Sequence, residues 1–125
     1  MKFSEYQEKA WSTAIYENKG SNLSYVAEGL FGEAGEVSEV VKRTHRKEEV
    51  DPIRLTKELG DVLWYIAGIC SELELSFEEV AHFTTTELYD AKYQLLTSIH
   101  LDRGTIKLGI SVGKVLECID SILYT

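Results

Sequence analysis

The sequence predicts an all-α fold, a bundle-like domain of four or five helices that spans residues 1–125. Proline occurs once in 125 residues, so few helix interiors are interrupted. Apolar residues recur every three or four positions along most of the chain, which is the spacing of one face of an amphipathic helix. Polar and glycine-containing segments separate these stretches, and no credible sheet pattern is found. We therefore expect helices that pack through their apolar stripes.

The first helix is expected over about residues 4–17. Ser4 and Gln7 have the spacing of a capping box, in which two side chains satisfy backbone amides at the start of a helix. The polar segment from Glu17 to Asn22 predicts the loop that follows.

The second helix is expected from about residue 22 to residue 45. Its apolar residues have the helical period and are Leu23, Val26, Ala27, Leu30, Ala34, Val37 and Val41. Asp51 followed by Pro52 predicts the N-cap and the first residue of a third helix. We centre the apolar stripe of this third helix on Leu59, and its members are Leu55, Leu59, Val62, Leu63, Ile66 and Cys70.

A fourth helix is expected from Ser76, which forms a second capping box with Glu79, to about Thr97. Residues 101–105 predict a turn. A last helix follows through Leu108, Val112, Val115, Leu116, Ile119 and Leu123, although residues 105–110 could begin it as extended chain. Both cysteines, Cys70 and Cys118, lie in apolar helical patterns and predict buried thiols of a reducing compartment, with a disulfide as the alternative.

The net charge of −8 argues against non-specific binding to nucleic acid and against binding to an anionic membrane surface. No apolar run approaches the length of a membrane span, and the first ten residues do not have the pattern of a signal peptide. We therefore expect a cytoplasmic protein.

Two pairs of acids lie beside the predicted core. Glu33 and Glu36 are three residues apart on the second helix, and Glu58 and Asp61 are three residues apart on the third. On a helical projection, each pair shares one flank of its apolar stripe. Two helices that pack through these stripes would bring the flanks together. Four carboxylates so arranged would repel one another unless a cation lay between them, and carboxylate ligands favour Mg²⁺, or Mn²⁺ as second choice. The alternative is a solvated acidic face on each helix.

Other residues of the acidic strip indicate what such a cation would present. Tyr65 lies one turn beyond Asp61, and Arg43 and Lys47 continue the strip beyond Glu36. This order suits a base, a metal and phosphates, although Tyr65 would equally serve helix packing and the two cations would equally be solvated. Three glycines, Gly32, Gly35 and Gly60, each weaken a helix, so we expect them to permit close approach of another group.

The segments GLFGEAGEV and KELGDVLWYIA resemble the MazG-like, all-α nucleoside triphosphate pyrophosphatases. The family signature is ExxE, a spacer and ExxD, which here reads Glu33 to Glu36, 21 residues, and Glu58 to Asp61. The similarity extends over about residues 6–81. Because the flanking residues match as well as the acids, the resemblance is specific.

The resemblance implies hydrolysis of a nucleoside triphosphate, or its deoxy form, to the monophosphate and pyrophosphate. Glu33, Glu36, Glu58 and Asp61 would hold Mg²⁺, and a metal-activated water would attack the α-phosphorus. We assign Glu36 as the base for that water. Tyr65 would lie by the nucleobase. The residues of the first helix that would help to close the pocket are Gln7 and Trp11.

The chain departs from the family pattern after Ala81. Relatives continue with basic residues that meet the phosphates, whereas this chain has Thr84, Glu87 and Ala91 at those places. The alternative reading is therefore a catalytically silent relative that binds a metal or a nucleotide in a regulatory role. The segment Arg103 to Thr105 resembles a turn of the family. Because the last helix is largely apolar, we also predict a homodimer or a dimer of dimers, with the site near the interface.

Overall fold

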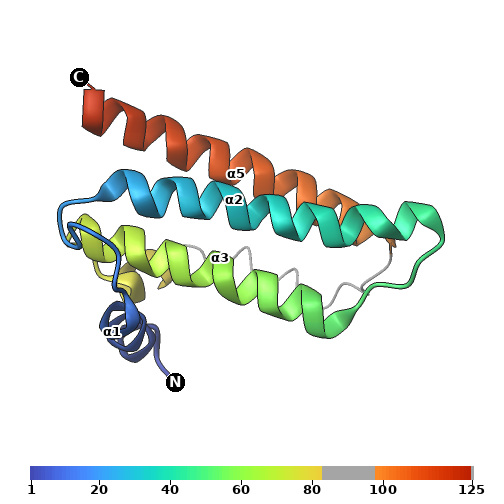
Figure 1. The fold of residues 1–125 in the computed structure, drawn as a ribbon, viewed down its shortest axis with the longest axis horizontal. Helices are drawn as coiled ribbons and strands as arrows, with labels where there is room; N and C mark the ends of the chain where they lie inside the picture. The colour runs from blue at the N-terminus through green and yellow to red at the C-terminus, as the bar shows by residue number, and fades with distance from the viewer. Residues whose placement is uncertain (83–97, 125) are drawn as a thin grey trace.

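The computed structural model describes residues 1–82 and 98–124. Its elements are α1 (Phe3–Thr13), α2 (Leu23–Lys42), the 3-10 helix η1 (Arg43–Arg46), α3 (Pro52–Glu72) and α5 (Ser98–Tyr124). Residues 77–82 are also helical, and none of the residues in these two ranges is in a strand. Helix α2 lies between α3 and α5, and α1 packs on α3 at one end (Figure 1). The prediction of an all-α fold is confirmed.

Helices α2 and α3 begin where the sequence predicts. The side chain of Asn22 accepts a hydrogen bond from the amide of Tyr25 at 3.2 Å, which caps α2. The carboxylate of Asp51 accepts from the amides of Ile53 and Arg54 at 3.0 and 3.2 Å, and Pro52 is the first residue of α3. Short polar side chains thus satisfy amides that have no partner within the helix.

The prediction for the first helix is wrong at both ends. The helix ends at Thr13, and its N-cap is Lys2, whose amide donates to the carboxylate of Glu5 at 3.0 Å. Gln7 does not complete a capping box with Ser4. Its amide group donates to the carbonyl of Leu75 at 2.9 Å and accepts from the amide of Phe77 at 2.9 Å. Packing of α1 against the end of α3 therefore uses the side chain that the local pattern assigned to capping.

The predicted turn at residues 101–105 is also wrong, because α5 runs through it without a break. The hydroxyl of Thr105 donates to the carbonyl of Leu101 at 2.9 Å, one turn earlier. Residues 105–110 are likewise helical, not extended, and the resemblance of Arg103 to Thr105 to a family turn has no counterpart in the structure. Helical continuation places Leu101 and Leu108 together on the side of α5 that faces α2 and α3.

The start of the predicted fourth helix lies within the described residues. The hydroxyl of Ser76 accepts a hydrogen bond from the amide of Glu79 at 3.3 Å. The rest of that helix lies outside the described residues, and so do Thr84, Glu87 and Ala91.

The main core lies between α2, α3 and α5. Its buried members are Leu23, Val26, Ala27, Leu30, Ala34, Val37, Val62, Ile69, Val112 and Ile119. The apolar stripe of α2 is as predicted, but that of α3 is not centred on Leu59, which is 47% exposed. Its neighbour Glu58 is only 6% exposed. The pattern of apolar residues misplaced the centre because a carboxylate, and not a leucine, occupies the buried position at this turn of α3.

The two cysteines differ in burial. Both are free, Cys70 is buried as predicted, and Cys118 is exposed, so the prediction for Cys118 is wrong. It lies on the side of α5 away from the core. Among the described helices, none has the length and apolar character needed to cross a membrane.

Candidate metal centre

Three acids from two helices meet at the α2–α3 contact. Glu33 comes from α2, and Glu58 and Asp61 come from α3. One carboxylate oxygen from each lies within 4.8 Å of the other two. Glu58 is buried, and the other two are partly buried. The acids are predicted to flank the core, and packing through the two apolar stripes does bring these three together.

The electrostatics of this acid cluster (Glu33, Glu58 and Asp61) favour a bound cation. Burial raises the pKa of Glu33 above its usual value of 4.5, and the negative charges of Asp61 and then Glu58 raise it further. A carboxylate that holds its proton more tightly is one whose charge is costly in the fold. The donor atoms are carboxylate oxygens only, which suits a hard divalent ion such as Mg²⁺ or Mn²⁺ and does not suit zinc. The residues present therefore fit the metal that the sequence implies.

Glu36 lies outside the acid cluster. Its side chain is 53% exposed, and one oxygen lies 3.7 Å from Nη2 of Arg54. Arg54 also places its Nε 3.8 Å from Oε1 of Glu58. Glu36 is therefore linked to the cluster through a guanidinium group and does not share its space. As a metal ligand and as a base, Glu36 remains a prediction.

Two cations that the sequence analysis missed lie against the acids. Besides Arg54, Lys57 places its Nζ 2.9 Å from Oδ2 of Asp61 and 3.5 Å from Oε2 of Glu58. Arg54 precedes Glu58 by four residues, and Lys57 precedes Asp61 by four, so the spacing of helical ion pairs was the available signal. Two basic side chains of α3 therefore partly neutralise the acid cluster.

Tyr65 packs against the backbone of α2 beside the acids. A Cβ added at Gly29 would lie 2.0 Å from Cε1 of Tyr65, so only glycine fits beneath this ring. By contrast, a Cβ at Gly32, Gly35 or Gly60 would meet nothing within 4 Å among residues 1–82 and 98–124. Within these ranges, the prediction that the three glycines permit a close approach is wrong. Gly29, four residues before Glu33, is the one that the site requires.

Tyr65 belongs to a row of aromatic rings that leads away from the acid cluster. Consecutive centroid distances are 5.0 Å for Trp64 to Tyr65, 6.3 Å for Tyr65 to Tyr25, 4.3 Å for Tyr25 to Tyr16, and 6.4 Å for Tyr16 to Trp11. Tyr25 and Tyr16 are stacked, and one of them, Tyr25, is exposed. Burial, a hydrogen bond with Tyr25 and nearby negative charges raise the pKa of Tyr65 to about 12. The tyrosine is therefore neutral at physiological pH.

A partly buried carboxylate side chain from the end of α3 fixes this row. Glu72 accepts hydrogen bonds from the hydroxyl of Tyr16 and from the amides of Gly20 and Asn22, the latter two at 2.9 and 3.1 Å. Burial and the bond to Glu72 raise the pKa of Tyr16. The loop between α1 and α2 is thereby held so that Tyr16 stacks on Tyr25. The helical projection places Tyr25 on the strip of Glu33 and Glu36, which was the signal for it.

The remaining predicted site residues lie at the ends of this region. The ring of Trp11 contacts Tyr16 and lies 4.5 Å from the ammonium group of Lys19. Gln7 is engaged by the backbone around Leu75. Tyr6 of α1 lies close enough to the acid cluster to be affected by its charge. Burial and then the charge of Asp61 raise the pKa of Tyr6.

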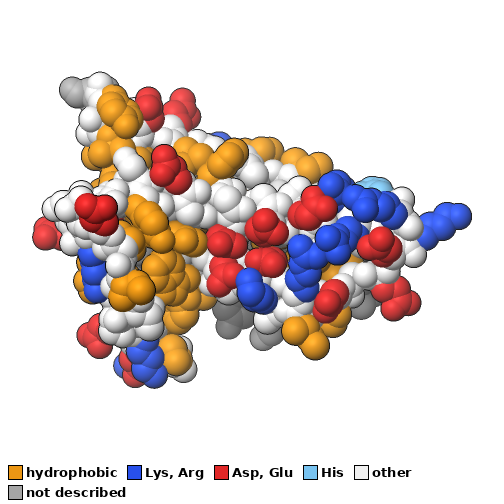
Figure 2. All heavy atoms as spheres, in the orientation of Figure 1, with side chains coloured by type: hydrophobic (Ala, Val, Ile, Leu, Met, Phe, Trp, Pro, Cys, Tyr) orange, Lys and Arg blue, Asp and Glu red, His pale blue; other side chains and the backbone are white. Residues whose placement is uncertain are grey.

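Arg43 and Lys47 lie beyond the end of α2. Arg43 is seven residues past Glu36, about 10 Å along a helix axis, and its Nε lies 3.9 Å from Oε1 of Glu39. Lys47 caps η1 in the left-handed conformation, with φ of 62°, and is exposed. Figure 2 shows acidic side chains gathered near the middle of one face, apolar side chains toward the α1 end, and basic side chains toward the α2–α3 connection.

Comparison with known proteins agrees with this geometry. Residues 21–90 match the MazG nucleotide pyrophosphohydrolase domain. The chain is also 35% identical over 112 residues to the Gene 37 protein of Mycobacterium phage L5, an alignment that covers 82% of this chain and 90% of that protein. The chain belongs to the MazG family.

The match to the MazG domain contains α2 and α3, with both pairs of acids and with Tyr25 and Tyr65. Helix α1, with Trp11, and helix α5 lie outside it. No solved structure is significantly similar to the chain. The MazG-like resemblance of the sequence is thus confirmed over the helices that carry the site.

Proposed function

We propose that the chain is a Mg²⁺-dependent nucleoside triphosphate pyrophosphohydrolase, which cleaves an NTP or a dNTP to the monophosphate and pyrophosphate. The observation that carries the proposal is the meeting of Glu33, Glu58 and Asp61 in a chain of the MazG family. Water attacks the α-phosphorus, the bond between the α-phosphorus and the bridging oxygen breaks, and pyrophosphate leaves. The location that we propose, the cytoplasm, is where nucleoside triphosphates are abundant.

We assign different roles to the acids inside and outside the acid cluster. Glu33, Glu58 and Asp61 would hold the divalent ion, which is supported by their oxygens lying within 4.8 Å of one another. When bound, the ion supplies positive charge to the triphosphate and lowers the pKa of water. Glu36 lies outside the cluster, 3.7 Å from the guanidinium group of Arg54, and we assign to it the role of accepting the proton of the attacking water.

The nucleotide would lie along the strip, with its base at the aromatic end and its phosphates at the basic end. The exposed ring of Tyr25, next to Tyr65, offers a stacking surface for a base, and Trp11 and Gln7 close that end. Arg43 and Lys47 are the cations assigned to the phosphate end. Stacking on tyrosine tolerates any base, so this arrangement sets no strong preference by itself.

The alternative is a catalytically silent relative that binds a metal or a nucleotide. One observation favours it: Lys57 and Arg54 already give the acid cluster positive partners. A panel of NTPs and dNTPs, with and without Mg²⁺, separates the two functions. The enzyme releases pyrophosphate only with the metal, and Glu58→Gln lowers the rate about 100-fold or more. If the purified wild type releases no pyrophosphate from any nucleotide of the panel, the silent function replaces the proposal.

We also propose that the chain forms a homodimer or a dimer of dimers near the site. Large apolar side chains are exposed on α5 and on the neighbouring turn of α2, namely Phe31, Ile106, Ile110, Ile122 and Tyr124. Among the described helices, α5 packs mainly on α2, and a second copy would cover the same stripe on both partners. Light scattering tests this proposal, and a monomeric mass at micromolar concentration would overturn it.

A further inference from the structure

Lys57 is the most exposed of the ion-paired groups at the acid cluster. Its ammonium group lies 2.9 Å from Asp61 and 3.5 Å from Glu58, two of the three acids that fit a metal. The side chain is nevertheless 68% exposed, whereas that of Arg54 is 31% exposed and lies between Glu36 and Glu58. An exposed lysine on a four-carbon stem changes its position at little cost, because a solvated ion pair contributes little stability.

A divalent ion and this ammonium group compete for the same oxygens. The three carboxylates lie within 4.8 Å of one another, so an ion among them would be in contact with the present position of Nζ. Positive charges this close repel strongly, and the weaker exposed partner is the one that leaves. Entry of the metal therefore requires Lys57 to move.

The released ammonium group remains at the site because its backbone is fixed. Lys57 is the residue immediately before Glu58 on α3, and its stem spans about 6 Å. Phosphate oxygens of a nucleotide bound at the ion would then be within reach of this ammonium group. A compact ammonium group with three donors suits such a contact, since it does not demand one geometry.

We propose that Lys57 is a built-in counter-ion that exchanges partners, leaving Asp61 and Glu58 when the metal enters and binding a phosphate oxygen of the nucleotide. This inference rests on the proposed function. It assigns Lys57 two opposite effects, competition with the metal and attraction of the substrate. A lysine that only formed the ion pair would compete with the metal but would not contribute to nucleotide binding.

Lys57→Met tests the exchange, because methionine keeps an unbranched stem without the charge. Calorimetric titration of Mg²⁺ without nucleotide should give about threefold to tenfold tighter binding than in wild type, the effect of removing one exposed competing charge. The difference should shrink in 0.5 M KCl. At saturating Mg²⁺, binding of an α,β-methylene nucleoside triphosphate should weaken by about fivefold to tenfold. Lys57→Arg should keep both wild-type affinities within about twofold.

The matched control is Lys42→Met. Lys42 forms a similar helical pair, with Nζ 2.7 Å from Oε2 of Glu39, away from the acid cluster. This variant should change neither affinity. Unchanged or weaker Mg²⁺ binding in Lys57→Met overturns the inference, and so does unchanged binding of the nucleotide analogue. Failure of the proposed function is distinct, because it would show in the wild type, as absence of Mg²⁺ binding or of pyrophosphate release.

Discussion

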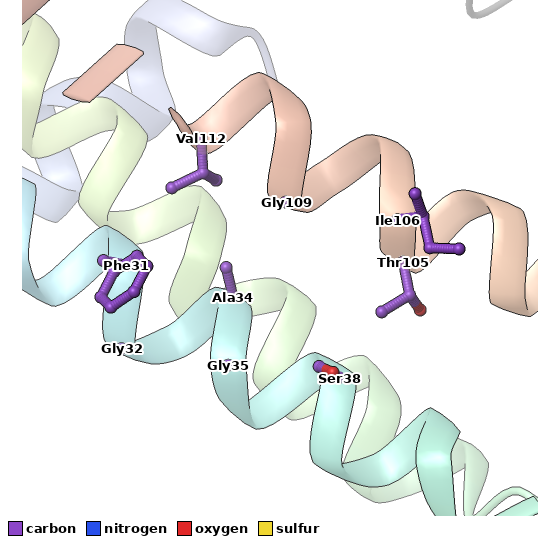
Figure 3. A pocket seen from close by; sticks show the side chains of 9 residues that line it. All are labelled: Phe31, Gly32, Ala34, Gly35, Ser38, Thr105, Ile106, Gly109 and Val112. Atoms are coloured by element: carbon purple, nitrogen blue, oxygen red, sulfur yellow. The ribbon is translucent and has the colours of Figure 1, made fainter. Parts of the chain in front are cut away.

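Helix α2 meets its two neighbours in opposite ways. Toward α3 the backbones approach closely, since the ring of Tyr65 lies over Gly29 and a Cβ at Gly68 would lie 3.1 Å from Cγ1 of Val26. Toward α5 a pocket of about 390 Å³ opens part of the contact, and its walls include Gly32, Gly35 and Gly109 (Figure 3). In the part of the chain that the structure describes, no atom lies within 4 Å of a Cβ at these three positions.

The difference shows that glycine has two uses on one helix. At Gly29 it gives a tyrosine its place beside the acid cluster, and the helix accepts the cost of glycine for that contact. At Gly32 and Gly35 none of the described residues uses the space. Close packing therefore positions the candidate site, while the α5 side carries exposed side chains such as Phe31 and Ile106.

The largest effect on stability is expected from Gly29→Ala. The added methyl group would overlap the ring of Tyr65, so that the ring or the helix must move, and the free energy of unfolding should fall by about 3 kcal/mol. Urea denaturation measures the change. Gly60→Ala, at an open position of α3, is the control and should raise the same quantity by up to about 1 kcal/mol. Equal stability of Gly29→Ala and wild type would contradict the account of the α2–α3 contact.

A smaller loss is expected from Glu72→Ala. The substitution leaves the amides of Gly20 and Asn22 without their acceptor, which should cost about 2 kcal/mol of unfolding free energy. It should also raise the KM for nucleotide if Tyr16 and Tyr25 form the base surface. Glu28→Ala, an exposed glutamate of α2, should remain within about 0.5 kcal/mol of wild type. A similar loss in both variants would show that Glu72 has no special role in holding the loop.

A gain of stability is expected from Gly35→Ala. Alanine is the better helix former and its methyl group has room, so the free energy of unfolding should rise by about 1 kcal/mol. Urea denaturation together with light scattering checks this prediction. A loss of stability, or a change in mass, would reveal that another group packs on this face of α2.

The smallest expected effect is the pH dependence that Glu33 causes in the metal-free protein. Its pKa is raised in the fold, so its charge destabilises the folded state at neutral pH. As the pH falls through the raised value toward 4.5, the folded protein takes up this proton first and the penalty disappears. Thermal melting without Mg²⁺ should show Glu33→Gln more stable than wild type at pH 7 and the difference lost near pH 4.5. If the difference in Tm between Glu33→Gln and wild type grew as the pH fell, the charge of Glu33 would not be destabilising and this prediction would be wrong.

The sequence predicted the elements whose local signals agree with their packing. The side chains of Asn22 and Asp51 accept hydrogen bonds from the first amides of α2 and α3, and the stripe of α2 is apolar throughout. Prediction failed where a tertiary contact overrides the local pattern. Gln7 has a capping partner nearby but bonds to the backbone near Leu75, and residues 101–105 have turn composition but pack as helix.

The candidate site could be predicted only in part, because some of its features depend on how the helices pack. Helical spacing and the family signature located the acids, since both depend on the order of residues alone. Burial of Glu58 in place of Leu59, and the role of Gly29, depend on the offset between two packed helices. That offset is a property of the α2–α3 contact and is not encoded in the period of either helix.

The central claim is that Glu33, Glu58 and Asp61 share one divalent ion. It is tested most directly by the increase in Tm that Mg²⁺ produces in wild type and in Glu58→Gln, measured without nucleotide. We predict an increase of several degrees in wild type that saturates with Mg²⁺, as binding to the folded state alone requires. In Glu58→Gln the increase should be lost, whatever the Tm of that variant without metal. An equal response of the two proteins to Mg²⁺ would contradict the claim.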